Sequence, residues 1–209
     1  MKRIGLFGGS FDPVHVGHLQ LARTALDHLQ LDELRWIPTG QAWQKQGAHA
    51  ASEDRAAMVQ AAIVDEPRCL LERCEIDRIG PSYTIDTLRE LQALEPHAEW
   101  FLIIGQDQYA NLHTWKDWQE VIARATLAVA SRGQALPDVH DTPLGRTPHR
   151  VVQLPMPPVP VSATAIRAEL ARGVLATSLP DTLVPPAVAS YIARHGLYRK
   201  IPPPSHLRS

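Results

Sequence analysis

The chain has 209 residues, of which 44% are hydrophobic and 21% are charged, so its composition is that of a globular protein with a substantial core. This length allows one compact domain with at most a small appendage and excludes a large multidomain protein. The formal net charge of −1 removes any bulk attraction to nucleic acid or to an anionic membrane, so neither partner is expected. Any site for phosphate groups must therefore be local.

Short apolar runs alternate with segments of helical spacing along the first two thirds of the chain. The predicted strands are Ile4–Gly8, Leu34–Pro38, Cys69–Cys74, Trp100–Ile104 and Leu127–Ser131. The predicted helices between them are Val16–Leu31, Ser52–Val64 with Ser52 as its cap, Ser82–Leu94 and Asp117–Arg124. This alternation predicts an α/β fold, a doubly wound, mainly parallel Rossmann-like sheet with helices on both faces. Ligands bind beyond the carboxyl ends of such strands, which directs attention to the loops after Leu6, Trp36 and Ile104.

The last third of the chain changes character. Residues 135–160 hold seven of the 18 prolines and little periodicity, which predicts a proline-rich connection. Two helices then follow, Ser162–Arg172 and Pro186–His195. We therefore predict one domain over 1–199, made of a core over 1–134, the connection over 135–160 and a small helical lobe over 161–199. The tail over 200–209 is expected to fray.

The two cysteines, Cys69 and Cys74, match neither a redox C-x-x-C pair nor a four-ligand zinc site, which excludes a disulfide scaffold. We expect both to be buried strand residues. The apolar stretch near the N-terminus is too short for a signal peptide, and no run of about 18 apolar residues occurs. A soluble, reduced, cytoplasmic protein is predicted.

A glycine-rich turn joins the first predicted strand to the first predicted helix. Glycines at a strand end let backbone amides approach a phosphate closely, and the helix N-terminus adds the positive end of its dipole. The turn fails the G-x-G-x-x-G pattern of dinucleotide-dependent oxidoreductases, and the chain contains no P-loop. The turn instead carries two imidazoles, those of His15 and His18.

His15 and His18 are separated by Val16 and Gly17, which puts one in the loop and the other in the first helical turn. Two such histidines in another setting would be a helix-entry residue and a core residue. Here the glycines, the strand end and the spacing coincide, so we expect both rings to face one phosphoryl group. A zinc pair is disfavoured because no third ligand of suitable spacing lies nearby.

Several segments resemble one family in the same order along the chain. The segment Gly8–Leu19 (GGSFDPVHVGHL) resembles the signature of the HxGH nucleotidylyltransferases, and the later segments resemble bacterial nicotinate mononucleotide adenylyltransferases. Those segments are Ile37–Lys45, Gly80–Leu88 (GPSYTIDTL), Phe101–Asp107 with Leu112–Trp115, Val161–Arg167 (VSATAIR), and Tyr191–Ile192 with Leu197–Tyr198. The resemblance covers residues 3 to about 199. The HxGH element alone identifies only the superfamily, whereas the ordered set is specific.

One segment departs from the pattern, because many members carry P-P-H-K where this chain has Ala42–Lys45. The nearest alternative is a transferase of the same superfamily with another acceptor, such as phosphopantetheine, a pyridoxal-like substrate or nicotinamide mononucleotide. The segments Gly80–Leu88 and Phe101–Trp115 disfavour the first two and leave nicotinamide mononucleotide open. A different class is a non-catalytic nucleotide sensor, which the intact His15, His18 and Arg167 disfavour.

The resemblance implies transfer of AMP from ATP to nicotinate mononucleotide, with Mg²⁺ carried on the ATP phosphates and no protein ligand for the metal. It implies catalytic roles for His15, His18 and Arg167. The implied ATP-binding residues are these three with Gly8, Gly9, Ser10, Phe11, Gly105, Asp107, Ser162 and Thr164. The implied mononucleotide-binding residues are Lys45, Ser82, Tyr83, Thr84, Trp115 and Arg132, with Trp115 favoured over Trp118 for stacking. Neither oligomeric state nor a role for His113 follows from the sequence.

Overall fold

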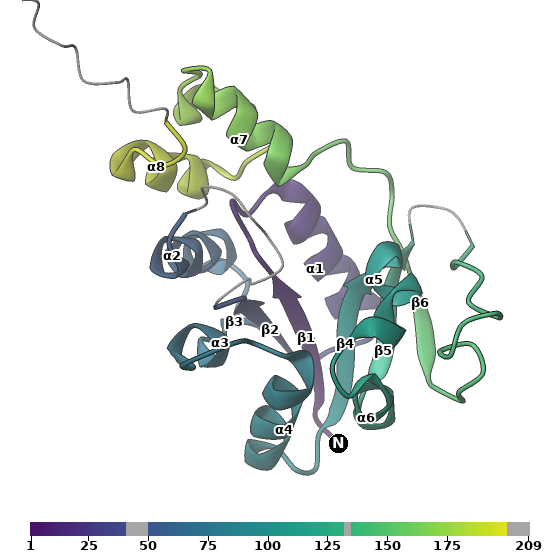
Figure 1. Ribbon diagram of the computed structural model, residues 1–209. Helices are drawn as coiled ribbons and strands as arrows, with labels where there is room; N and C mark the ends of the chain where they lie inside the picture. Colours follow the sequence, from purple (N-terminus) through teal and green to yellow (C-terminus); the bar gives the residue numbers. More distant parts are fainter. Residues whose placement is uncertain (41–49, 132–134, 200–209) are drawn as a thin grey trace, which may run out of the picture.

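The computed structural model describes residues 1–40, 50–131 and 135–199. Its strands form one sheet in the order β3-β2-β1-β4-β5-β6, and every neighbouring pair is parallel (Figure 1). They are β1 (Arg3–Gly9), β2 (Glu33–Pro38), β3 (Cys69–Leu71), β4 (Glu99–Gly105), β5 (Thr126–Ser131) and β6 (Val151–Pro155). The predicted doubly wound parallel sheet is confirmed.

The helices cover both faces of this sheet. They are α1 (Val16–His28), α2 (Ser52–Ile63), α3 (Cys74–Asp77), α4 (Thr84–Leu94), α5 (Gln106–Ala110), α6 (Trp118–Arg124), α7 (Ala163–Ala171) and α8 (Pro186–His195), with 3-10 turns η1 (Leu112–Thr114) and η2 (Ala176–Ser178). Alternate strand residues bury on opposite faces, as the side-chain period of two requires. In β4, Phe101 and Ile103 pack with α1 and α2, whereas Leu102 and Ile104 pack with α4 and α6.

The strand order reverses at β1. From β1 the chain builds outward through β2 to β3, then returns to place β4 on the other side of β1 and continues to β6. The loops that leave β1 and β4 therefore diverge, which opens a crevice at their carboxyl ends. This is the edge of the sheet at which the glycine turn lies.

Two segments differ from the sequence-based prediction. The strand predicted over Cys69–Cys74 ends at Leu71, and Cys74 begins the short helix α3, where it is only half-buried. The expectation of a buried strand residue is therefore wrong for Cys74 and right for Cys69. An edge strand pairs on one side only, so β3 is free to stop once its pairing with β2 ends at Trp36.

The connection predicted over 135–160 contains a sixth strand, β6, so it is not a plain linker. Only Leu154 of β6 is buried, because this edge strand lies on the sheet's exposed border, and its apolar pattern is correspondingly weak. Pro155, which has no backbone N–H, ends the strand. Because β6 is an edge strand, no further strand of the described residues lies on its open side to need this N–H as a hydrogen-bond donor. Helices α7 and α8 pack into the same apolar cluster as α1 and α2 through Ile166 and Val188.

The remaining predicted elements occur with shifts of at most three residues at their ends. Helix α1 ends at His28, before the left-handed Gln30, and Ser52 is the first residue of α2 instead of its cap. Within the described residues, no helix is both long and apolar enough to cross a membrane.

Candidate active site

The loop that follows β1 turns sharply back into α1. Phe11 takes a left-handed backbone conformation (φ +48°), and its ring is buried against Phe7, His18 and Trp36. Gly9 leaves room for this ring, since a Cβ there would lie 3.0 Å from it, a tight contact that would require the ring to shift. The buried Phe11 ring thus anchors the loop in the core, while Gly8, Gly9 and Ser10 of the same segment line the crevice.

His15 and His18 lie face to face at the start of α1. Their ring centroids are 3.7 Å apart with planes 18° from parallel, and the His15 backbone N–H donates to His18 Nδ1 at 3.2 Å. Since His18 Nδ1 accepts a hydrogen bond, the proton of a neutral His18 ring is on Nε2. Burial lowers the pKa of His15 to about 4. At neutral pH His15 is therefore uncharged.

Helix α7 begins directly opposite this pair. Ser162 caps it by accepting a hydrogen bond from the Ala165 N–H at 3.2 Å, as its residue type predicts. A Cβ on Gly17 would lie 3.1 Å from Val161, so the glycine allows the two helix N-termini to approach. Arg167 of α7 donates to the backbone carbonyl of Asp12 at 2.7 Å. The N-termini of α1 and α7 thus face one loop.

A buried ionic cluster that sequence reasoning missed holds the loop from behind. Arg55 of α2 is 6% exposed and donates to the carbonyls of Ser10 (2.9 Å) and Thr39 (2.6 Å), which joins the ends of β1 and β2. Asp12 is 2% exposed, and its Oδ1 accepts from the Tyr198 hydroxyl at 2.6 Å and from the Ala50 N–H at 3.1 Å. Burial, together with the Asp12 carboxylate, raises the pKa of Tyr198 above its usual range.

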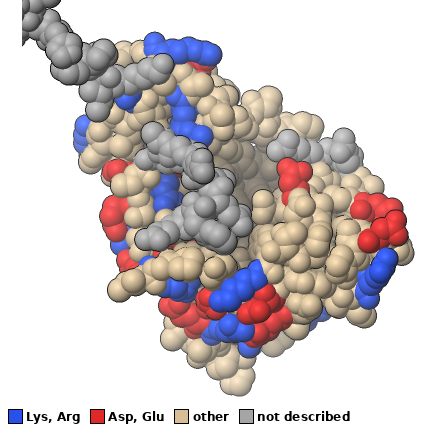
Figure 2. Space-filling model, in the orientation of Figure 1, with Lys and Arg blue, Asp and Glu red and all other residues tan. Residues whose placement is uncertain are grey.

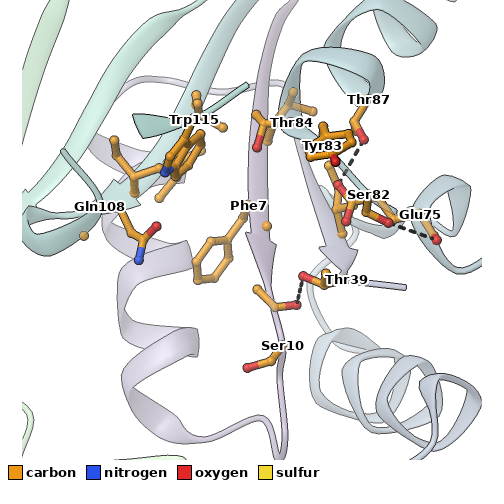
Figure 3. Close-up of a pocket in the computed structure, with 18 of the residues that line it drawn as sticks. Phe7, Ser10, Thr39, Glu75, Ser82, Tyr83, Thr84, Thr87, Gln108 and Trp115 are labelled. Carbon is orange, nitrogen blue, oxygen red and sulfur yellow. Dashed lines mark hydrogen bonds between the residues drawn. The ribbon is translucent and has the colours of Figure 1, made fainter. Parts of the chain in front are cut away.

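The crevice between β1 and β4 holds a cavity of about 650 Å³, a size suited to a nucleotide-sized ligand. In Figure 3, Trp115 and Gln108 lie on one side of β1 and Tyr83, Ser82 and Glu75 lie on the other. Apolar side chains from β2 and β4, among them Ile37 and Ile104, also line it. The cavity therefore combines apolar walls, one indole and a few polar groups.

The polar side of the cavity is built around the N-terminus of α4. The Ser82 hydroxyl and the carbonyl of Glu75 are 3.4 Å apart in a hydrogen bond, and the Thr87 hydroxyl donates to Glu75 Oε1 at 2.9 Å (Figure 3). Burial raises the pKa of Glu75 above its usual range. A Cβ on Gly40 would lie 1.9 Å from the Glu75 carbonyl oxygen, so only glycine fits at the end of this strand loop.

The two candidate tryptophans differ in placement. Trp115 and Trp118 both pack against the apolar cluster that contains α4 and α6, but of the two only Trp115 lines the cavity. Its neighbour Lys116, which the sequence did not single out, lines it as well. Asp107 is exposed, and it is not one of the described residues that line the cavity.

Comparisons with known proteins agree with this architecture. The model of the cytidylyltransferase-like family matches residues 6–169. The chain is 57% identical, over 94% of its length and 92% of the relative's, to a "Probable nicotinate-nucleotide adenylyltransferase" of Methylibium petroleiphilum. It is 41% identical, over 96% of its length and all of the relative's, to one of Neisseria meningitidis.

The chain belongs to the nicotinate-nucleotide adenylyltransferase family. Its fold matches the "Plasmodium falciparum nicotinic acid mononucleotide adenylyltransferase complexed with NaAD" with a TM-score of 0.70 and 18% identity, over 95% of this chain and 98% of that one. The same Plasmodium protein "complexed with APC" gives a TM-score of 0.72 at 17% identity over the same shares.

Apart from Asp107, the described site residues predicted from the family resemblance fall into two groups. Cavity-lining residues are Gly8, Gly9, Ser10, Ser82, Tyr83, Thr84, Gly105 and Trp115. Residues around the loop and the start of α7 are Phe11, His15, His18, Ser162, Thr164 and Arg167. Lys45 and Arg132 lie outside the described residues.

The molecular surface shows no single basic field on the side that Figure 2 presents. Lysine and arginine side chains lie beside aspartate and glutamate there, in keeping with the net charge of −1. The composition therefore still predicts that any positive potential for phosphate groups is local.

Proposed function

We propose that this chain transfers the AMP moiety of ATP to nicotinate mononucleotide, giving nicotinic acid adenine dinucleotide and pyrophosphate. The observation that carries the proposal is the pairing of two sites at one strand end. The stacked rings of His15 and His18 stand at the loop after β1, and the cavity lined by Trp115 opens beside the same strand. Family membership at 57% identity supports this activity.

The reaction needs little from the protein beyond position and charge stabilisation. The attacking group is a phosphate monoester, whose second pKa near 6 leaves it mostly dianionic at pH 7, so it needs no general base. Direct in-line attack on the α-phosphate then forms one P–O bond while the bond to pyrophosphate breaks, without a covalent intermediate. The enzyme has to bring two anions together and stabilise the charge that spreads over them.

The loop side supplies hydrogen-bond donors for ATP in this proposal. His18 Nε2–H and the neutral His15 ring face the α-phosphate, and backbone amides of Gly8–Phe11 contribute further donors. The N-terminus of α7 with Arg167 binds the departing β- and γ-phosphates, with Ser162 and Thr164 beside it. Gly105 and Asp107 contact the adenosine ribose.

The cavity side supplies the acceptor site. The indole of Trp115 stacks on the pyridine ring, and the amides at the start of α4, near Ser82, Tyr83 and Thr84, meet the carboxylate. A helix N-terminus favours a carboxylate over an uncharged amide. Lys45 and Arg132, outside the described residues, are proposed to approach the phosphates of the bound nucleotides.

Magnesium fits this site as part of the ATP complex. Mg²⁺ prefers oxygen ligands, and within the described residues no group of three histidine, cysteine, aspartate or glutamate side chains is placed to hold a metal. Phosphate oxygens would therefore hold the ion, where it would neutralise part of their charge. We also propose a cytoplasmic location, which the free thiols of Cys69 and Cys74 support.

The test is to incubate the protein with Mg-ATP and, separately, nicotinate mononucleotide and nicotinamide mononucleotide, and to measure pyrophosphate release together with the dinucleotide formed. We expect faster turnover of the acid. Faster turnover of the amide would contradict the assigned substrate, and binding of both nucleotides with no product would favour a non-catalytic sensor.

A further inference from the structure

The charge of the acceptor cavity depends on two side chains. Among the described residues that line it, Glu75 and Lys116 are the ones with carboxylate or ammonium groups. Glu75 is turned toward Thr87, whose hydroxyl donates to it and in turn accepts from Arg78 at 3.2 Å. Lys116 is the cation of this lining.

Lys116 stands over the first turn of α4. Its ammonium lies 4.4 Å from the centre of the Tyr83 ring, and Tyr83 directly precedes Thr84, the first residue of the helix. The initial amides of any α-helix have no partner within the helix, and in the described part of the chain no side chain caps α4. The ammonium and these amides therefore face the same end of the cavity.

The present partner of Lys116 is easily exchanged. Its Nζ lies 3.3 Å from Asp86 Oδ2, with side chains 44% and 32% exposed, so the pair is weak. Asp86 also accepts from Arg89 Nη1 at 3.2 Å, through its other carboxylate oxygen. Lys116 is therefore able to turn to a new anion while Asp86 keeps a cationic partner.

We propose that Lys116 is a specificity-determining residue that favours a pyridine mononucleotide with a carboxylate over the one with an uncharged amide. The inference rests on the proposed function, because it concerns the acceptor of that reaction. The two substrates differ by one negative charge at the ring substituent. A cation beside that substituent stabilises the acid and leaves the amide almost unaffected, whereas the stacking of Trp115 is shared by both.

The experiment measures the dissociation constants of nicotinate and nicotinamide mononucleotides by calorimetry, in the full-length protein, for the wild type, Lys116→Gln and Lys116→Arg. We expect Lys116→Gln to weaken binding of the acid about fivefold, the size of a half-exposed ion pair, and to change binding of the amide by less than about twofold. Lys116→Arg keeps the charge and should retain the preference. The difference should shrink in high salt.

Two further variants sharpen the test. Asp86→Asn removes the competing carboxylate and should raise the preference for the acid about twofold. Arg68→Gln is the matched control, because Arg68 is 42% exposed and ion-paired but precedes β3 at the opposite, amino end of the sheet. It should leave the ratio of the two constants unchanged.

The outcomes separate this inference from the proposed function. If Lys116→Gln weakens the acid and the amide equally, or neither, the role of Lys116 is wrong even when the wild type forms dinucleotide from the acid. If the wild type forms no dinucleotide, the proposed function fails, and the binding ratio of the variants still decides whether Lys116 selects the acid.

Discussion

The two halves of the crevice are built with different degrees of internal restraint. On the side of the loop after β1, the buried Arg55 and Asp12 tie this loop to β2, to α7 and to Tyr198, which follows α8. On the acceptor side, Lys116 and Asp86 are each about one third or more exposed. The side to which we assign stabilisation of the developing charge is thus fixed in advance, which is where preorganisation matters most, and the side proposed to bind the acceptor keeps adjustable contacts.

The largest expected effect is on chemistry at the fixed side. His18→Ala removes the Nε2–H donor, and we expect kcat to fall about 10²- to 10³-fold, as for loss of one preorganised donor in other enzymes. Steady-state pyrophosphate release measures it, with circular dichroism to check the fold. A variant that is folded and retains the wild-type kcat would show that His18 takes no part in the reaction.

The second prediction tests the buried contacts of Arg55 that hold the loop after β1. Arg55→Met leaves the carbonyls of Ser10 and Thr39 without this donor and removes one of the cations near Asp12, where Arg167 remains at 3.9 Å, so we expect a loss of about 3 kcal/mol in the free energy of unfolding. Urea unfolding measures the loss. Arg124→Met, which breaks a surface ion pair with Glu120, is the control and should cost less than about 1 kcal/mol. An equal loss in the free energy of unfolding for Arg55→Met and Arg124→Met would show that the buried arginine stabilises the fold no more than the exposed one.

A pH series tests the burial of His15. The pKa of His15 is about 4 in the folded chain and 6.5 in a model peptide, so the unfolded chain binds the proton more readily. Its contribution to stability is therefore fully present above about pH 6.5 and declines as the pH falls towards 4, by up to about 3 kcal/mol. Comparing the wild type with His15→Asn between pH 7 and pH 4 isolates this loss. Parallel stability curves for the two proteins would mean that His15 titrates normally.

The smallest effect concerns the C-terminal anchor. Tyr198→Phe removes one hydrogen bond to the buried Asp12 and should cost about 1 kcal/mol in thermal or urea unfolding, while leaving the affinity for the mononucleotide unchanged. Tyr191→Phe removes a similar bond, to Asp54 of α2, and serves as the matched control, with a smaller expected loss because Tyr191 is less buried. A change in mononucleotide affinity in Tyr198→Phe would show that the two halves are coupled.

Sequence patterns predicted the sheet and the position of the glycine-rich loop between β1 and α1 well because both have local signals. Buried parallel strands such as β1 and β4 are continuous apolar runs, and the spacing of His15 and His18 lies within one helical turn. The edge strand β6 escaped notice because only Leu154 in it is buried. Arg55 and Lys116 carry no local signal, since their partners are distant in sequence and become neighbours only in the folded chain. Tyr198 lies in a segment that resembles the family, but its bond to Asp12 could not be read from the sequence for the same reason.

The bond from Tyr198 to Asp12 spans 186 positions of the chain. Protein synthesis runs from the N-terminus, so the glycine turn and α1 leave the ribosome long before their last partner exists. A nascent chain can form β1, α1 and β2 early, but Asp12 has to wait for almost the whole described sequence before Tyr198 arrives. Completion of the loop after β1 therefore has to follow the synthesis of residue 198, and a chain cut off before that residue would carry His15 and His18 without this anchor for Asp12.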